Sequence, residues 1–442
     1  MWMTIVVFAL PLVLALLLSW HPALGAFRHS ALNPLLIFTA YVVLVAGDYM
    51  SITLNGHGEL AQSSIVASRS LLMALQFKQA TMMLVILLAF ALAFSVLLKS
   101  PRHIRKPTKS NTGKVAVIIY LAILFSWFAA LLGLGVKVDS LADTIAVKNA
   151  STWAAPLFIL SMLLVPALTY ALVRKPLRVA VPLVILSIAI VLLSGSRTRV
   201  LFVLIPFAFY LVRVRGIPMP RFYFFVGILA IGFLAIAALN VRLLASERKT
   251  IAFENTLTIP NIFELNDVSF AETSIGLARI GPKRTESYVG EDLVGFVLAP
   301  IPRSIIPLKP EPGSRQFTQI YDPYNYYRYQ RGLTIGGINE ITYDYAFPLA
   351  VLVVFGIAFS FAFLFVRASQ SKSVHGFAWT VGLYISFYIF LKQDLQSSGQ
   401  VGTIFAVYYF FMRFLEMMAS RLGQPVPRAG LGRPERAGGH PQ

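Results

Sequence analysis

The feature that most constrains this chain is a series of eleven apolar runs, each separated from the next by a polar segment. A transmembrane helix needs about 20 predominantly apolar residues, and somewhat fewer when anchoring residues flank it. Hydrophobic residues make up 57% of the 442 residues, and a soluble domain would have too few polar residues to cover so much apolar surface. We therefore predict an all-α integral membrane protein with about eleven spans, at residues 3–20, 32–47, 80–98, 115–135, 153–173, 179–194, 200–213, 222–244, 346–366, 377–391 and 402–418.

Lysine and arginine in the connecting segments indicate how these spans are oriented. Residues 99–114 carry six basic residues and no acid, and further basic residues follow the fifth and seventh spans and occur in the C-terminal tail. Basic loops face the cytoplasm. Alternate threading places all of these segments on one side, with the N-terminus outside and the C-terminus inside. The net charge of +19 therefore indicates membrane orientation and does not indicate nucleic-acid binding.

The acidic residues agree with this orientation, because all of the 19 except Glu416 and Glu435 then lie on the outer side. We expect helices 1–8 in residues 1–244 and a large periplasmic loop of helical and irregular structure in 245–345. Helices 9–11 then occupy 346–418, and a basic, disordered cytoplasmic tail occupies 419–442. The first run has no basic start and is longer than the core of a typical signal peptide, so we interpret it as a retained helix.

The large outer loop carries twelve acids and ten bases, and long structured loops tend to be functional. We expect an amphipathic helix at about residues 260–280. The apolar stretch Leu293–Pro302 is too short to span and is typical of an interfacial or re-entrant segment. The chain has no cysteine, its six histidines lack metal-ligand spacing, and no GxxxxGK[ST] motif occurs. We therefore expect neither a metal nor a nucleotide cofactor.

Arginines on the outer side are the first candidates for function. The turn Ser194–Arg199 (SGSRTR) carries Arg197 and Arg199 among small residues, against the usual distribution of positive charge. A guanidinium group suits phosphate oxygens, so a lipid diphosphate is one natural partner. The alternative is that these arginines extend to lipid headgroups or pair with an acid of the outer loop.

The outer loop supplies further candidates. Prolines hold Arg303 and Lys309 in an extended segment, with Arg315 beyond it, where they can neutralise a leaving diphosphate or pair with nearby acids. The tyrosine cluster around Tyr327 suits either sugar rings or the membrane interface. Glu340, in the segment Gly336–Glu340, is a candidate general base or a salt-bridge partner of Arg197. Arg242, at the outer end of the eighth span, is a weaker candidate for substrate binding.

Taken together, these features resemble the O-antigen polymerase (Wzy-like) family of oligosaccharide repeat-unit polymerases. The resemblance lies in the SGSRT turn between two apolar helices and in the outer loop, with PRSIIPLKP followed by GGINEITYDYAFP. Some relatives show an Arg-x10-Gly pattern, which Arg279 with Gly290 and Arg284 with Gly295 fit. The related O-antigen ligases use a histidine in this loop, and none occurs between Ala245 and Tyr345, which favours a polymerase.

The resemblance implies a metal-independent glycosyltransferase of the bacterial inner membrane, active at the periplasmic face. It implies undecaprenyl-diphosphate-linked glycans as substrates, membrane lipids as surroundings, and a chain-length regulator and a flippase as associated proteins. Catalytic roles would then fall to Arg197, Arg303 and Glu340, and substrate contacts to Arg199, Lys309, Arg315, Tyr327 and Arg242. A lipid-linked oligosaccharide flippase or other transporter, an O-antigen ligase and a non-enzymatic export scaffold are the alternatives.

Overall fold

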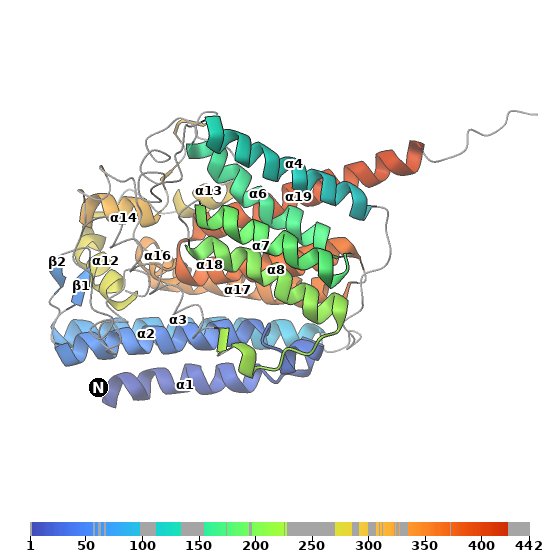
Figure 1. Ribbon diagram of the computed structural model, residues 1–442. Coiled ribbons are helices and arrows are strands. Elements are labelled where there is room, and N and C mark those ends of the chain that lie inside the picture. The colour runs from blue at the N-terminus through green and yellow to red at the C-terminus, as the bar shows by residue number, and fades with distance from the viewer. Residues whose placement is uncertain are drawn as a thin grey trace, which may run out of the picture.

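A computed structural model shows a bundle of long helices with shorter helices gathered at one end (Figure 1). Helices are expected because an apolar medium offers the backbone no hydrogen-bond partners, and an α-helix satisfies its own amides and carbonyls. The structure describes residues 2–55, 58–60, 63–65, 68–97, 112–133, 154–173, 175–193, 197–224, 226–227, 270–284, 291–298, 306–308, 310–311, 313–321, 323, 327, 335–371 and 373–422.

The first three long helices pack together along one side of the bundle (Figure 1). The short 3-10 helix η1 (Pro22–His29) joins the first two of them. The three helices are α1 (Trp2–Leu18), α2 (Pro34–Asn55) and α3 (Arg69–Leu97). Five further apolar helices complete this part of the bundle, and α8 continues into a π-helical turn, η2 (Tyr210–Arg215). They are α4 (Thr112–Gly133), α6 (Ala154–Leu172), α7 (Leu177–Leu193) and α8 (Arg197–Phe209), with α17 (Phe347–Gln370) packed against α3.

The last two helices, α18 (Val374–Lys392) and α19 (Leu395–Leu422), pack against each other. Five described helices are long and apolar enough to cross a membrane, at Pro34–Leu54, Arg69–Leu97, Phe347–Gln370, Val374–Lys392 and Leu395–Met418. Four shorter apolar helices accompany them, at Trp2–Leu18, Val115–Ala129, Met162–Leu172 and Leu177–Val191. The expectation of a helical membrane protein is thus confirmed, whereas the count of eleven spans stays a prediction. Most of the predicted span 222–244 lies outside the described residues.

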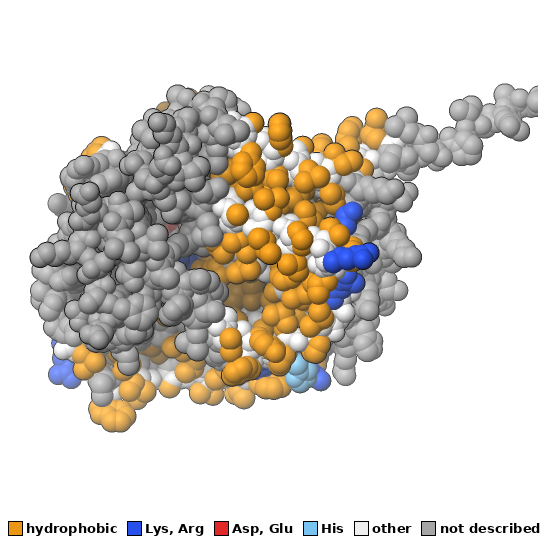
Figure 2. Space-filling model, viewed as in Figure 1, with side chains coloured by type: hydrophobic (Ala, Val, Ile, Leu, Met, Phe, Trp, Pro, Cys, Tyr) orange, Lys and Arg blue, Asp and Glu red, His pale blue; other side chains and the backbone are white. Residues whose placement is uncertain are grey.

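The core of the bundle is aromatic where α3, α17 and α18 meet. The rings of Phe361 and Phe387 stack with their centroids 4.2 Å apart, and Phe90 lies 5.5 Å from Phe387. Large apolar side chains are also exposed on the outside, among them Phe125 (74% exposed), Leu352 and Phe410. Figure 2 shows this apolar surface over the middle of the visible face, with lysine and arginine at its right-hand end. Soluble proteins rarely expose so continuous an apolar surface, whereas lipid covers it without cost.

The two ends of the bundle differ in charge, and we name them accordingly. The acidic end carries five buried carboxylates, those of Asp48, Glu272, Glu340, Asp344 and Asp394. The basic end carries Lys175, Arg178, Arg213, Arg215, Arg221 and Arg367, and Glu416 is the acid described there. The orientation of these ends relative to the two sides of the membrane stays a prediction.

Four short helices gather at the acidic end (Figure 1). They are α12 (Phe270–Arg284), α13 (Glu291–Leu298), α14 (Gly313–Tyr321) and α16 (Gly337–Asp344). The predicted helix 260–280 overlaps α12, although residues 260–269 lie outside the described part. The apolar stretch at Leu293 falls in α13, which packs against α19 with the ring of Phe296 over Gly399.

One short β-hairpin accompanies the helices of this all-α fold. The strands β1 (Gly58–Leu60) and β2 (Ser63–Ile65) form an antiparallel hairpin between α2 and α3, with Glu59 opposite Ser64. Three-residue strands are too short to produce a recognisable alternation of apolar and polar residues, so the pattern could not predict them.

Gly382 allows α18 and α19 to approach closely, and this contact can be tested. A Cβ at Gly382 would lie 2.7 Å from the ring of Phe405, whereas nothing lies within 4 Å of a Cβ at Gly356. We expect Gly382→Val to destabilise the bundle by about 1–3 kcal/mol through overpacking. Thermal unfolding in detergent measures the effect. Gly356→Val is the matched control in α17, and equal stability of the two variants would contradict the prediction.

Candidate functional site

The structure describes only some of the residues expected to form a site. Arg303, Lys309 and Arg242 lie outside the described residues, and the side chains of Arg197 and Arg199 are not described. The backbone of Arg197 starts α8, and Figure 1 places the start of this helix toward the acidic end. The roles expected for these five residues stay predictions.

Three of the expected residues are described, and all belong to the acidic end. Arg315 lies in the first turn of α14 and is partly buried. Tyr327 is 69% exposed, and its hydroxyl accepts a hydrogen bond from Gln319 Nε2 at 3.2 Å. Glu340 lies in α16 and is almost completely buried, with 1% of its surface exposed. The described residues thus place Glu340 in the interior and Tyr327 on the surface.

Helix α16 is the centre of the acidic end, and two glycines permit its position. Gly336 has a φ of 75°, a conformation that other residues rarely adopt. A Cβ at Gly337 would lie 2.7 Å from the ring of Phe390 and 2.8 Å from its carbonyl oxygen. Any side chain at this position would therefore push α16 away from the end of α18. The GGINE sequence is explained by this close approach.

Asn339 joins α16 to α12. Its amide nitrogen donates to the carbonyl oxygens of Phe270 at 3.1 Å and Ile335 at 2.9 Å, and its amide oxygen accepts from the Ser274 hydroxyl at 2.9 Å. Asn339 and Ser274 are both buried. A buried amide with this many partners fixes the relative position of two helices, because losing one partner would leave a polar group unsatisfied in a dry environment.

Glu340 lies between the starts of two helices. Its Oε2 accepts a hydrogen bond from the backbone amide of Leu395, the first residue of α19, at 2.7 Å. Its side chain also packs directly against Gly313 at the start of α14, where even a Cβ would overlap the carboxylate. Carboxylates are favoured at helix N-termini because the first amides of a helix have no intrahelical acceptor. These contacts give Glu340 a positioning role, and the general-base role stays a prediction.

Asp394 and Asp48 also accept hydrogen bonds from backbone amides at the starts of helices. Asp394 accepts from the Ser397 amide at 2.6 Å, as an N-cap of α19, and from the Ser314 hydroxyl at 2.6 Å. Asp48, near the end of α2, accepts from the Ala271 amide in the first turn of α12 at 2.5 Å. Each acid therefore ties a long helix to a short one.

Lys78 is a described cation of this end that does not belong to the predicted site residues. Its Nζ donates to the Thr342 carbonyl oxygen at 2.5 Å and lies 4.3 Å from the centroid of the Tyr343 ring. Burial raises the pKa of the Tyr343 hydroxyl above its ordinary value, so the ring under the ammonium group is a neutral phenol. Helix α3 begins at Arg69, well before the predicted span at residue 80, and this extension carries Lys78 to α16. In the sequence, the feature that could have indicated this role is a single lysine just before an apolar run, on the side of the bundle that carries the acidic residues.

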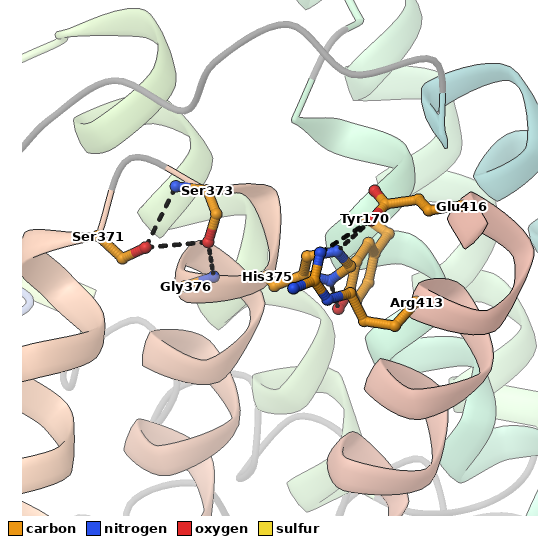
Figure 3. A network of polar contacts seen from close by, with 7 residues as sticks. All are labelled: Tyr170, Ser371, Ser373, His375, Gly376, Arg413 and Glu416. Carbon is orange, nitrogen blue, oxygen red and sulfur yellow. Dashed lines mark hydrogen bonds and ion pairs between the residues drawn. The ribbon is translucent and has the colours of Figure 1, made fainter. Parts of the chain in front are cut away.

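A second polar network lies at the opposite end of the bundle and is drawn in Figure 3. The His375 ring in α18 lies between the Tyr170 hydroxyl of α6 (2.8 Å to Nδ1) and Glu416 Oε2 of α19 (2.9 Å from Nε2). Arg413 reaches the same carboxylate oxygen at 3.5 Å. The network joins three helices at the basic end. Among the described side chains at either end, no three His, Asp or Glu residues lie close enough to hold a metal ion.

The acidic end is thus a polar assembly of short helices seated on an apolar helical bundle, and the chain is a helical membrane protein. Comparison of the chain with models of known protein families, with curated proteins and with solved structures finds no match.

The contact between Lys78 and α16 can be tested by Lys78→Met. The variant keeps an unbranched side chain but loses the charge-assisted hydrogen bond to the Thr342 carbonyl, which contributes about 1.5–3 kcal/mol. We expect the amides of α16 to exchange with solvent roughly tenfold faster or more, measured by hydrogen exchange with mass spectrometry. Arg69→Met, at an exposed position of the same helix, is the control. Unchanged exchange in α16 would show that Lys78 does not hold it.

Proposed function

We propose that this protein is a glycosyltransferase that joins undecaprenyl-diphosphate-linked oligosaccharide repeat units at the periplasmic face of a bacterial inner membrane. In this reaction an acceptor sugar hydroxyl attacks the anomeric carbon of the donor glycan. A new glycosidic bond forms, the bond from the anomeric carbon to the diphosphate oxygen breaks, and undecaprenyl diphosphate leaves with the electron pair. A base takes the proton of the hydroxyl.

The observation that carries the proposal is the separation of polar from apolar residues along the bundle. The charged residues of the five long apolar helices lie toward their ends, and the acidic end adds four short helices built around buried polar groups. A transporter would need polar side chains along a path through its spans. An enzyme that acts on a lipid-linked substrate needs its polar groups at one membrane surface, and this distribution supports that requirement.

The start of α8 supports a role for Arg197. The first turn of a helix has backbone amides without intrahelical acceptors, and helix N-termini are suited to phosphate groups. Because α8 begins at Arg197, both Arg197 and Arg199 belong to the first turn of this helix. Such a turn is suited to stabilising the negative charge that develops on the leaving diphosphate. Arg303 and Arg315 are the further cations that we assign to this task.

Arg197→Ala tests this assignment. Removing one preorganised donor from a developing anion costs about 10²–10³-fold in rate. We expect surface glycan of single repeat units, with unchanged abundance of the variant in the membrane. Gel analysis of glycan length in a deletion strain complemented with each variant measures this. Arg178→Ala, an exposed arginine of the basic end, is the control. Polymer of ordinary length in the Arg197→Ala strain would contradict the assignment, and repeat units trapped in the cytoplasm of the deletion strain would indicate a flippase.

Glu340→Gln separates the two roles of Glu340. Glutamine keeps an oxygen that can accept from the Leu395 amide but cannot take a proton from a sugar hydroxyl. Because the carboxylate is buried against two helix starts, we expect the variant to remain within about 1 kcal/mol of the parent in stability and to make polymer. Glu340→Ala should lower the thermal stability by about 1–3 kcal/mol. Loss of polymer by a stable Glu340→Gln protein would instead assign Glu340 as the general base.

A further inference from the structure

Two segments that are far apart in the sequence meet at the basic end of the bundle. The amide of Ala31 donates to the Met219 carbonyl oxygen at 2.8 Å, and Ser30 and Pro220 form an antiparallel bridge. This pairing brings the segment after η2 against η1 and the end of α1. Arg221 directly follows the bridge and is therefore held against these two elements.

Arg221 is fixed by neutral partners. Its Nη1 donates to the Ser19 hydroxyl at 2.9 Å and its Nη2 to the Ser19 carbonyl oxygen at 2.7 Å. Its Nε donates to the Arg28 carbonyl oxygen at 2.7 Å. The guanidinium group lies over the Trp20 ring, 3.7 Å from its centroid. Carbonyl and hydroxyl oxygens orient a guanidinium group but leave its full positive charge without a counter-ion.

A second guanidinium group belongs to the same cluster. Arg28 is exposed, and its Nε donates to His29 Nε2 at 2.7 Å, while neither Nη group has a partner among the described residues. The His29 ring in turn lies 5.3 Å from the Trp20 ring that Arg221 covers. Among the described residues of the basic end, Glu416 is the acidic residue, and its carboxylate already contacts His375 and Arg413. Arg28 and Arg221 therefore form a cluster of two cations without an acid, in the part of the chain that the structure describes.

Exposed aromatic side chains surround this cluster. Trp20 is 52% exposed, Phe222 69% and Tyr223 52%. Tryptophan and tyrosine are enriched where a protein crosses from hydrocarbon to water, at the level of the lipid headgroups. Arginine matches the geometry of phosphate oxygens and forms paired hydrogen bonds with them. The cluster thus combines aromatic residues typical of the lipid headgroup layer with arginines suited to binding phosphate.

We propose that Arg28 and Arg221, with Trp20 and His29, bind the phosphate headgroup of an anionic glycerophospholipid at the basic end. The free Nη groups of Arg28 contact the phosphate, and the fixed charge of Arg221 attracts it. A lipid is the occupant, and a soluble anion is not, because the flanking aromatic side chains are exposed where acyl chains would cover them. This site is separate from the acidic end and does not depend on the proposed glycosyltransferase activity.

Native mass spectrometry of the full-length protein in detergent tests this proposal. The protein is titrated with dioleoylphosphatidylglycerol and, separately, with the zwitterionic dioleoylphosphatidylcholine. Arg28→Gln is the test variant, because the exposed Arg28 side chain has His29 as its one hydrogen-bond partner among the described residues, and its loss should not disturb the fold. Arg178→Gln is the matched control, an exposed arginine at the same end without a described partner.

We expect the parent to bind phosphatidylglycerol more tightly than phosphatidylcholine. Arg28→Gln should weaken binding of phosphatidylglycerol about fivefold, the factor for one basic residue at an anionic surface. Arg178→Gln should change it by less than about twofold. Equal losses in the two variants would overturn the site in favour of general attraction to a basic surface. Equal binding of the two lipids, or displacement of phosphatidylglycerol by millimolar inorganic phosphate, would overturn the lipid as its occupant.

Discussion

The structure of the acidic end depends on one interaction, the hydrogen bond from a helix-terminal amide to a buried carboxylate. The first amides of a helix have no acceptor within the helix. When such an amide is buried without any other acceptor, the folded state loses about 1–3 kcal/mol of stability. Asp48 serves α12, whereas Glu340 and Asp394 serve α19. Asp48 of the long helix α2 thereby holds the start of the short helix α12, and Glu340 of the short helix α16 holds the start of the long helix α19.

Much of the bundle could be predicted from the sequence, because helices that face lipid consist of continuous runs of apolar residues. The limits of the runs were less informative where a helix extends beyond its apolar part. Helix α3 continues eleven residues before the predicted start, with Lys78 in the extension, and α19 starts at Leu395, seven residues before its predicted span. Hydropathy reports contact with lipid, and it does not report where backbone hydrogen bonding begins.

The site was harder to predict because its order comes from contacts between distant segments. The Gly336–Glu340 sequence marked a turn of interest, yet nothing in it indicates that Asn339 would bind Phe270 and Ser274. Likewise, the pairing of Ala31 with Met219 creates the cation cluster at the basic end from segments that carry no shared motif. Sequence patterns report the local environment of a residue, whereas these contacts depend on how helices are arranged in space.

Helix α19 is attached at both ends of the molecule. Its first amide is bonded to Glu340 of α16, and near its other end Glu416 is bonded to His375 of α18. Helix α18 returns between these two points, with Phe390 against Gly337. Helices α16, α18 and α19 therefore form a closed circuit of contacts that runs from the acidic end to the basic end of the bundle.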